Sequence, residues 1–454
     1  MIAPLLLAAA LAPQGEFPTG TLVEAVATTA DPTQTYTLYL PAGYPGDRRW
    51  PLLLVFDPRG RTRLAAELFR PAAEQFGWIV VSSADTRSDG PMEPNLKALR
   101  ALWAEAHLRF ASDPRRIYAA GFSGGAHLGW MLAESTRRLA GVIASGGRVI
   151  DEVERGTAVF ASFAAAGDVD FNHRGTREVD RLLAARGGPH RLEFFSGGHQ
   201  WMPESLASHA VAWMELMAMR QGLRPADSEL VEQLYIGDSA AAATLERSGD
   251  ALAAMRRWDS VARTFAGLRD TTEARRRADE LGAGKPVAAA LRAEQRCDEF
   301  EDERLAAAFG ELSRIAAPGR PPTVGQVTSA IGIASLHRRA SEPGCAGLTA
   351  RRVLETTATQ AGFYVTRDLF AAERWDAAAV ALEVAIEAKP ESSPLWYNLA
   401  CARARSGQPA KALEALQRAV DAGYRDLAHL EADPDLEAIR GEPGYRTLVE
   451  SLRR

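Results

Sequence analysis

The sequence predicts an α/β protein with a doubly wound, mostly parallel sheet, followed by an all-helical region. Between about residues 17 and 222, short apolar segments alternate with amphipathic ones. This alternation is typical of parallel strands that helices cover on both faces. After about residue 223 the strand-like segments cease, and small and apolar residues recur at helical spacing instead.

Length and charge limit the possible functions. The chain has 454 residues, of which 46% are hydrophobic, so it can form several packed cores. Its formal net charge is -5, with acidic and basic residues interspersed, which argues against a nucleic-acid partner.

The apolar run at residues 1–12 resembles a signal peptide and is too short to span a bilayer. We therefore expect export to a periplasmic or extracellular location and no integral membrane segment; the alternative is a retained tail on a cytoplasmic protein.

The strands of the first region are predicted from short β-branched and aromatic segments. Thr35–Leu40 alternates as a half-exposed strand, whereas Pro51–Phe56 is apolar throughout. Further strands are expected at residues 78–82, 117–120, 141–145, 159–164 and 191–195. The connection between the strands near Ile143 and Phe160 is too short for a large lid domain.

The segment Gly121-Phe122-Ser123-Gly124-Gly125 reads Gly-x-Ser-x-Gly between a predicted strand and a predicted helix. In such a nucleophile elbow the serine adopts an unfavourable backbone conformation, and the neighbouring glycines let strand and helix approach each other. The alternative is a chance match in a chain rich in Gly and Ala. Candidate acid and base residues further along the sequence favour the nucleophile elbow over a chance match.

Acyl transfer by Ser123 needs a base and an acid that orients it. The loop after the strand at residues 159–164 contains Asp168 and Asp170, and we favour Asp170 because it stands three residues after Gly167. Alternatively, both are solvated turn residues, or they bind a metal with His173. The base is expected at His199, because Gly197 and Gly198 allow the loop to turn toward the sheet edge. We interpret His127, His190 and His209 as structural.

The developing oxyanion needs N–H donors, which we assign to Gly124 and Arg59. Pro58 has no N–H, so Arg59 or Gly60 must supply the second donor if it comes from this loop, and we favour Arg59. The side chains of Arg59 and Arg61 either make the site mouth basic or simply lie at the surface. Trp201 either forms a wall of the substrate pocket or packs its own loop. No cofactor or metal site is indicated.

Residues 17–222 resemble the α/β-hydrolase superfamily, and within it the serine esterases grouped with feruloyl esterases, polyhydroxybutyrate depolymerases and dienelactone hydrolase-like proteins. The matching segments are Leu40-Pro41-x-Gly43-Tyr44, Phe56-Asp57-Pro58, Gly121 to Gly125, Asp170 and Gly198-His199. The resemblance implies hydrolysis of a small-molecule or polymeric ester through an acyl-enzyme on Ser123. Asp57-Pro58 stands where lipases carry a His-Gly-Gly-like run, which weakens a lipase assignment.

The helical part is predicted to contain a middle region at 223–358 and a repeat region at 359–454. Ala378, Leu382 and Ala385 recur 34 positions later as Ala412, Leu416 and Ala419. This is the period of tetratricopeptide repeats, so residues 359 to about 426 resemble two such repeats, followed by a capping segment. A protein partner is the corresponding expectation.

The chain has three cysteines, and their pairing depends on whether the protein is exported. If the protein is exported, Cys297 and Cys345 can form a disulfide, and Cys401 is interpreted as a buried hydrophobic residue.

The leading hypothesis is an exported serine carboxylesterase. The alternatives are a repeat-based binding protein with a catalytically degenerate hydrolase scaffold, and a serine peptidase on the same fold.

Overall fold

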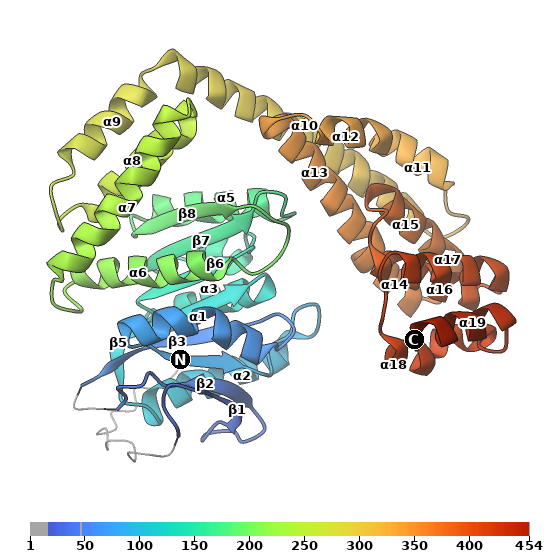
Figure 1. Cartoon of the computed structure of the whole chain (residues 1–454), viewed down its shortest axis with the longest axis horizontal. Helices are drawn as coiled ribbons and strands as arrows, with labels where there is room; N and C mark the ends of the chain where they lie inside the picture. Colours follow the sequence, from blue (N-terminus) through green and yellow to red (C-terminus); the bar gives the residue numbers. More distant parts are fainter. Residues whose placement is uncertain (1–16, 46–47, 454) are drawn as a thin grey trace. The chain divides into compact units, whose positions relative to one another are not determined.

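The structure is a computed structural model that describes residues 17–45 and 48–453. The predicted signal peptide at residues 1–12 lies outside the described residues. The chain divides into two compact units, the first ending at Leu291 and the second beginning at Arg292. The first unit contains the sheet, and the second is helical (Figure 1).

The sheet of the first unit has eight strands in the order β1-β2-β4-β3-β5-β6-β7-β8. Strands β3 to β8 pair in parallel, whereas β1 and β2 are antiparallel to their neighbours. This mostly parallel sheet with flanking helices confirms the predicted α/β-hydrolase fold class. The strands are β1 (Leu22–Ala27), β2 (Thr35–Tyr39), β3 (Trp50–Phe56), β4 (Ile79–Ser83), β5 (Ser112–Phe122), β6 (Gly141–Ser145), β7 (Ala161–Gly167) and β8 (His190–Phe195).

Helices cover both faces of this sheet because its central strands are apolar on both sides. Within β3, Leu53 and Val55 pack into a core with helices α1 and α6, whereas Leu52 and Leu54 pack into a core with α2 and α3 on the other face. Every residue of β3 is buried, as expected for a parallel strand in a doubly wound sheet. The flanking helices are α1 (Thr62–Phe76), α2 (Met92–Leu108), α3 (Gly124–Thr136), α4 (Asp151–Arg155), α5 (His173–Ala185) and α6 (Glu204–Arg220).

Three further helices belong to the first unit: α7 (Ser228–Arg247), α8 (Ala251–Phe265) and α9 (Thr272–Gly282). Trp258 and Phe265 of α8 share a hydrophobic core with Trp213 of α6. A buried charge network reinforces this packing, because Arg191 of β8 pairs with Asp238 of α7 at 2.6 Å. These helices therefore share a hydrophobic core with the sheet, although they follow the domain end predicted at residue 222.

The second unit is built from helices around its own apolar core. The repeated residues of α15 and α17 lie in that core: Ala378, Leu382 and Ala385, and likewise Ala412, Leu416 and Ala419, are all 0% exposed. The helices are α10 (Lys285–Ala316), which begins in the first unit, α11 (Val324–Ile331), α12 (Ile333–Ala340), α13 (Gly344–Thr359), the π-helix η1 (Gln360–Val365), α14 (Thr366–Ala371), α15 (Trp375–Ala388), α16 (Ser393–Arg405), α17 (Pro409–Asp421), α18 (Leu427–Ala432), the 3-10 helix η2 (Pro434–Ile439) and α19 (Pro443–Leu452).

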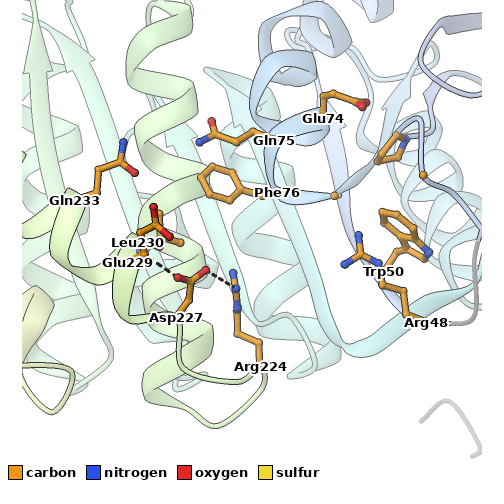
Figure 2. A pocket seen from close by; sticks show the side chains of 13 residues that line it. Arg48, Trp50, Glu74, Gln75, Phe76, Arg224, Asp227, Glu229, Leu230 and Gln233 are labelled. Carbon is orange, nitrogen blue, oxygen red and sulfur yellow. Dashed lines mark hydrogen bonds and ion pairs between the residues drawn. The ribbon is translucent and has the colours of Figure 1, made fainter.

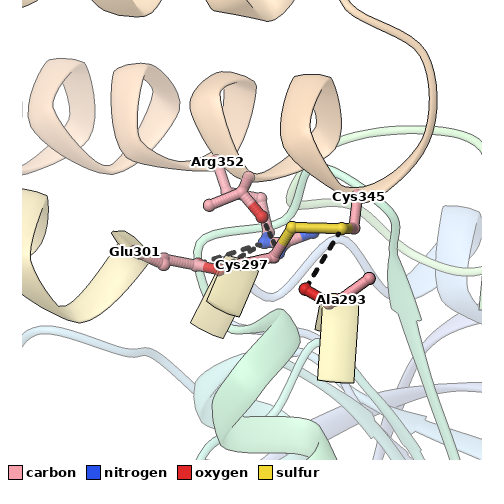
Figure 3. Close-up of a disulfide and its surroundings, with 6 residues drawn as sticks. Ala293, Cys297, Glu301, Cys345 and Arg352 are labelled. Carbon is pink, nitrogen blue, oxygen red and sulfur yellow. Dashed lines mark hydrogen bonds and ion pairs between the residues drawn. A yellow bond between two sulfur atoms is a disulfide. The ribbon is translucent and has the colours of Figure 1, made fainter. Parts of the chain in front are cut away.

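A disulfide joins α10 to the start of α13 in the second unit. Cys297 and Cys345 form this bond, and one turn further along α10 the Glu301 carboxylate pairs with Arg352 at 2.7 Å (Figure 3). Cys401 is the remaining cysteine and is buried, as the sequence predicts. The structure therefore contains the pairing that the sequence left open.

Candidate active site

Ser123 lies at the end of β5, where the chain turns sharply into α3. Its backbone angles are φ 54° and ψ -120°, a conformation that non-glycine residues rarely adopt. A Cβ on Gly121 would lie 2.1 Å from the Gly125 carbonyl oxygen, and one on Gly125 would lie 1.9 Å from the Phe56 carbonyl oxygen. Glycine is therefore sterically required on both sides of the turn, as the nucleophile-elbow interpretation expects.

The structure brings the three predicted catalytic side chains together at the carboxyl edge of the sheet. The His199 Nε2 atom lies 2.9 Å from Ser123 Oγ, and His199 Nδ1 lies 2.8 Å from Asp170 Oδ1. These distances form an unbroken hydrogen-bonded chain from hydroxyl to imidazole to carboxylate. Such a chain can transfer a proton away from the serine hydroxyl while it holds the imidazole in one orientation.

The loop after β7 contains both Asp168 and Asp170, and their carboxylates have different hydrogen-bond partners. Asp170 is fully buried, and its Oδ1 also accepts a hydrogen bond from the Asn172 N–H at 2.7 Å. Asp168 instead accepts a hydrogen bond from the Gly197 N–H at 3.1 Å. Asp170 therefore contacts the imidazole, whereas Asp168 anchors the loop that carries it.

Two phenylalanines that the sequence patterns did not single out hold the His199 ring. The ring centroid of Phe171 lies 4.0 Å from that of His199, and the centroid of Phe122 lies 4.6 Å from it. Gly146, at φ 59°, fits closely here, because a Cβ on it would lie 3.2 Å from His199 Nδ1. Phe122 and Phe171 are sequence neighbours of Ser123 and Asp170, and this adjacency is the only signal that could have indicated them.

The loop after β3 directs its N–H groups inward, toward Asp57. The N–H of Arg59, the predicted second oxyanion donor, bonds to Asp57 Oδ1 at 2.8 Å, and the N–H of Gly60 bonds to the Asp57 carbonyl oxygen at 3.1 Å. Both backbone donors that the sequence offered are thus already occupied in this structure. Among the described residues, the N–H of Gly124 has no acceptor, in keeping with its place at the first turn of α3.

Asp57 also binds the two side chains that were considered for substrate binding. Its carboxylate pairs with the Arg61 guanidinium at 2.8 Å and accepts a hydrogen bond from the Trp201 indole N–H at 2.8 Å. Trp201 is 8% exposed, so its contacts agree with the alternative in which it packs its loop. Burial raises the pKa of the Asp57 carboxyl, but the hydrogen bonds from Arg61 and Trp201 outweigh burial and hold that pKa below its usual value.

His127 lies one helical turn beyond Ser123 on α3 and is held as a neutral imidazole. Burial lowers its pKa to about 4, and the positive charge of Arg148 and the nearby His199 add to the effect. Its Nε2 atom accepts a hydrogen bond from the Arg148 N–H at 3.4 Å. His127 therefore carries no charge at neutral pH, although it lies close to the base.

A separate pocket of about 560 Å³ lies at the opposite edge of the sheet (Figure 2). Its lining includes Trp50, the first residue of β3, and Gly77, which precedes β4, so it opens at the amino ends of these strands. Arg224 and Asp227 pair with each other across part of its wall at 3.3 Å. Ser123 does not line this pocket, so the pocket is distinct from the site at the carboxyl edge.

The described residues contain neither a metal-binding cluster nor a membrane-spanning helix. No group of three or more His, Cys, Asp or Glu side chains in residues 17–45 and 48–453 is arranged to hold a metal ion. Within the same ranges, no helix combines the length and the apolar character needed to cross a bilayer.

Comparisons with known proteins give partial matches. No family model matches the chain. A chloroplastic protein of Arabidopsis thaliana is 31% identical to it over 82 residues, which are 17% of this chain and 24% of that protein. The chain thus matches about a quarter of the length of this curated relative.

Several solved structures are similar to less than half of this chain. An esterase from Pyrobaculum calidifontis is 13% identical and covers 44% of this chain and 87% of its own, with a TM-score of 0.37. A ferulic acid esterase is 15% identical and covers 43% and 97%, with a TM-score of 0.36. An S-formylglutathione hydrolase from Staphylococcus aureus is 14% identical and covers 45% and 99%, with a TM-score of 0.37. The first two of these similar proteins are esterases, and each match covers less than half of this chain.

Proposed function

We propose that the first unit is a serine hydrolase that cleaves carboxylic esters through an acyl-enzyme. The observation that carries this proposal is the pair of hydrogen bonds from His199, at 2.9 Å to Ser123 and at 2.8 Å to Asp170. The strained backbone of Ser123 adds support, because a φ of 54° is retained only where surrounding structure imposes it.

The proposed reaction follows from these contacts. Ser123 Oγ attacks the ester carbonyl carbon while His199 Nε2 accepts the hydroxyl proton, and Asp170 stabilises the resulting imidazolium. The tetrahedral intermediate collapses as His199 returns that proton to the alcohol oxygen, which leaves an acyl group on Ser123. Water, deprotonated by His199, then attacks the acyl carbonyl, and the acid is released as the serine hydroxyl is restored. The Gly124 N–H donates to the carbonyl oxygen when it becomes negative.

The direct test is labelling with a fluorophosphonate probe and mapping of the labelled peptide. Wild-type protein is expected to be modified at Ser123, and Ser123→Ala to lose both labelling and ester turnover. Ser135→Ala is the matched control, because Ser135 is an exposed serine on the same helix, and it is expected to label normally. A folded wild-type protein that is neither labelled nor active on esters would contradict the proposal.

Ester hydrolysis is separated from peptide hydrolysis by the choice of substrate. A panel of p-nitrophenyl esters beside aminoacyl p-nitroanilides uses the same chromophore-releasing assay for both classes. The proposal expects turnover of esters with much slower release from anilides. Faster turnover of the anilides would favour a serine peptidase on the same fold.

A second candidate function concerns the helical unit, which we propose binds a protein partner as a tetratricopeptide-like module. The observation in its favour is that residues spaced 34 positions apart, such as Leu382 and Leu416, are both fully buried. Partner capture by the full-length Ser123→Ala variant, compared with wild type, tests this function without catalysis. Capture that requires Ser123 would contradict an independent binding module.

Export is the proposed localisation, and the disulfide supports it. Structural disulfides form mainly in oxidising compartments, and Cys297 and Cys345 are paired in the second unit. Fractionation of cells that express the full chain, with non-reducing peptide mapping of each fraction, tests this proposal. Protein found only in the cytoplasm with both thiols free would contradict it.

A further inference from the structure

Around Ser123, the N–H of Gly124 has no acceptor among the described residues, whereas the backbone N–H groups of the loop after β3 are already bonded. Oxyanion stabilisation in acyl transfer relies on donors that converge on one oxygen. The Gly124 N–H is available, but the N–H groups of Arg59 and Arg61 both bond to Asp57 Oδ1, at 2.8 Å and 3.2 Å. The N–H of Gly60 bonds to the Asp57 carbonyl oxygen at 3.1 Å. In this structure, the loop after β3 therefore offers no free backbone N–H as a second donor.

A side-chain hydroxyl from another loop lies against Gly124. Ser88, in the loop after β4, packs against the backbone of Gly124: a Cβ on Gly124 would lie 2.7 Å from Ser88 Oγ and 2.8 Å from Ser88 Cβ. The Ser88 side chain therefore adjoins the residue whose N–H is the free donor.

The backbone around Ser88 is held in place by several hydrogen bonds. The Ser88 N–H donates to the Pro58 carbonyl oxygen at 2.8 Å, and Thr86 Oγ1 donates to the Asp57 carbonyl oxygen at 3.1 Å. The side chain of Asn95 bonds both backbone groups of Arg87, each at 2.8 Å. Ser88 is thus supported on both the loop after β3 and helix α2, so a donor at this position is preorganised.

The Ser88 hydroxyl itself is weakly bonded. Its one described acceptor is the Pro58 carbonyl oxygen at 3.5 Å, which is beyond the usual O–H···O range. A hydroxyl rotates freely about its Cβ–Oγ bond, so its proton can turn to a stronger acceptor at little cost. A negatively charged oxygen beside the Gly124 N–H would be such an acceptor.

From these contacts we infer that Ser88 is a catalytic residue, which donates its hydroxyl proton in a hydrogen bond to the oxyanion as the second donor beside the Gly124 N–H. The inference rests on the proposed hydrolase function. No proton is transferred from Ser88; the bond strengthens as charge develops on the substrate oxygen and weakens when the carbonyl reforms. The contribution is therefore to the transition state rather than to ground-state binding.

The test is steady-state turnover of a p-nitrophenyl ester by wild type, Ser88→Ala and Ser135→Ala. Loss of one oxyanion donor lowers kcat by about 100-fold in comparable enzymes. We expect a loss of this order for Ser88→Ala with KM changed less than about threefold, slower fluorophosphonate labelling, and no change for Ser135→Ala. Thermal unfolding of each variant verifies that the fold is retained.

Ser88→Cys keeps the inference testable if Ser88→Ala unfolds. A thiol is somewhat larger than the hydroxyl and donates weakly, so kcat is again expected to fall by more than about tenfold. Unchanged kcat in either folded variant would overturn the role of Ser88 but not the hydrolase function. The second donor would then be sought elsewhere, for example in the Arg59 N–H after its release from Asp57. Wild-type protein without labelling or turnover would instead overturn the hydrolase function, and the inference with it.

Discussion

The indole N–H of Trp201 donates to the buried carboxylate of Asp57 at 2.8 Å and so joins loops that are 144 residues apart in the sequence. Trp201 stands two residues beyond His199, and Asp57 organises the loop after β3. One hydrogen bond therefore ties the segment that carries the proposed base to the segment beside the proposed oxyanion site.

Trp201→Phe is expected to lower both stability and turnover. The substitution keeps an aromatic ring against Phe69 and Phe122. It removes one donor from the buried Asp57 carboxylate, which keeps its bonds from Arg61. Loss of a buried hydrogen bond to a charged group costs about 2 kcal/mol, which denaturant unfolding measures. Trp103→Phe, at a half-buried tryptophan on α2, is the control and should change stability far less. Equal stability of the two variants would show that the bond to Asp57 has no structural role.

His127 is expected to make stability depend on pH in mildly acidic solution. Its pKa is lowered from 6.5 to about 4 in the folded protein, chiefly by burial. Between these two values the unfolded chain binds a proton that the folded protein does not, so stability falls as the pH decreases from about 6.5 to about 4. The full difference corresponds to about 3 kcal/mol at this residue.

Denaturant unfolding of wild type and His127→Gln across this pH range measures the effect. Glutamine can accept the Arg148 hydrogen bond but does not titrate, so the variant should lose less stability on acidification. His107→Gln, at an exposed histidine, is the control and should follow the wild-type profile. Parallel profiles for wild type and His127→Gln would contradict a lowered pKa for His127.

Much of the fold could be predicted because the strands of a doubly wound sheet are apolar on both faces. The segment at 141–145 was predicted with the bounds that the structure gives to β6, and Pro51–Phe56 differs from β3 by one residue. β1 was missed. It is an edge strand with a mostly exposed pattern and a register shift between Val23 and Val26, so it shows neither a continuous apolar run nor a clean alternation.

The candidate site, like the fold, could be predicted only in part. Ser123, Asp170 and His199 could be proposed because each stands in a short local pattern after a strand. The contacts of Asp57 with Trp201 and of Ser88 with Gly124 join segments that are distant in the sequence, and no local pattern encodes such pairs. The Arg59 N–H also could not be assigned from sequence, because its acceptor depends on how the loop folds around the Asp57 carboxylate.

Gly125→Ala is expected to disrupt the turn at Ser123. The new methyl group would lie 1.9 Å from the Phe56 carbonyl oxygen, which belongs to the central strand β3 and cannot move cheaply. We expect a loss of more than about 3 kcal/mol in stability, or failure to fold. Gly237→Ala is the matched control: Gly237 is exposed on α7 with open space around its Cα, and alanine favours the helix there by about 1 kcal/mol. A stable Gly125→Ala variant with normal turnover would contradict the tight strand-to-helix approach.

The disulfide is expected to stabilise the second unit by restricting its unfolded chain. Cys297 and Cys345 are 48 positions apart, and closing a loop of this length stabilises a protein by about 4 kcal/mol in the chain-entropy model. Replacing both cysteines with alanine should therefore lower the free energy of unfolding of this unit by up to that amount. Wild type treated with reductant should lose a similar amount, whereas the double variant should not respond to reductant, because buried Cys401 is its remaining cysteine. Peptide mapping verifies that the disulfide is intact before treatment with reductant and broken after it. If wild type then unfolds at the same denaturant concentration in both states, the disulfide does not stabilise the unit.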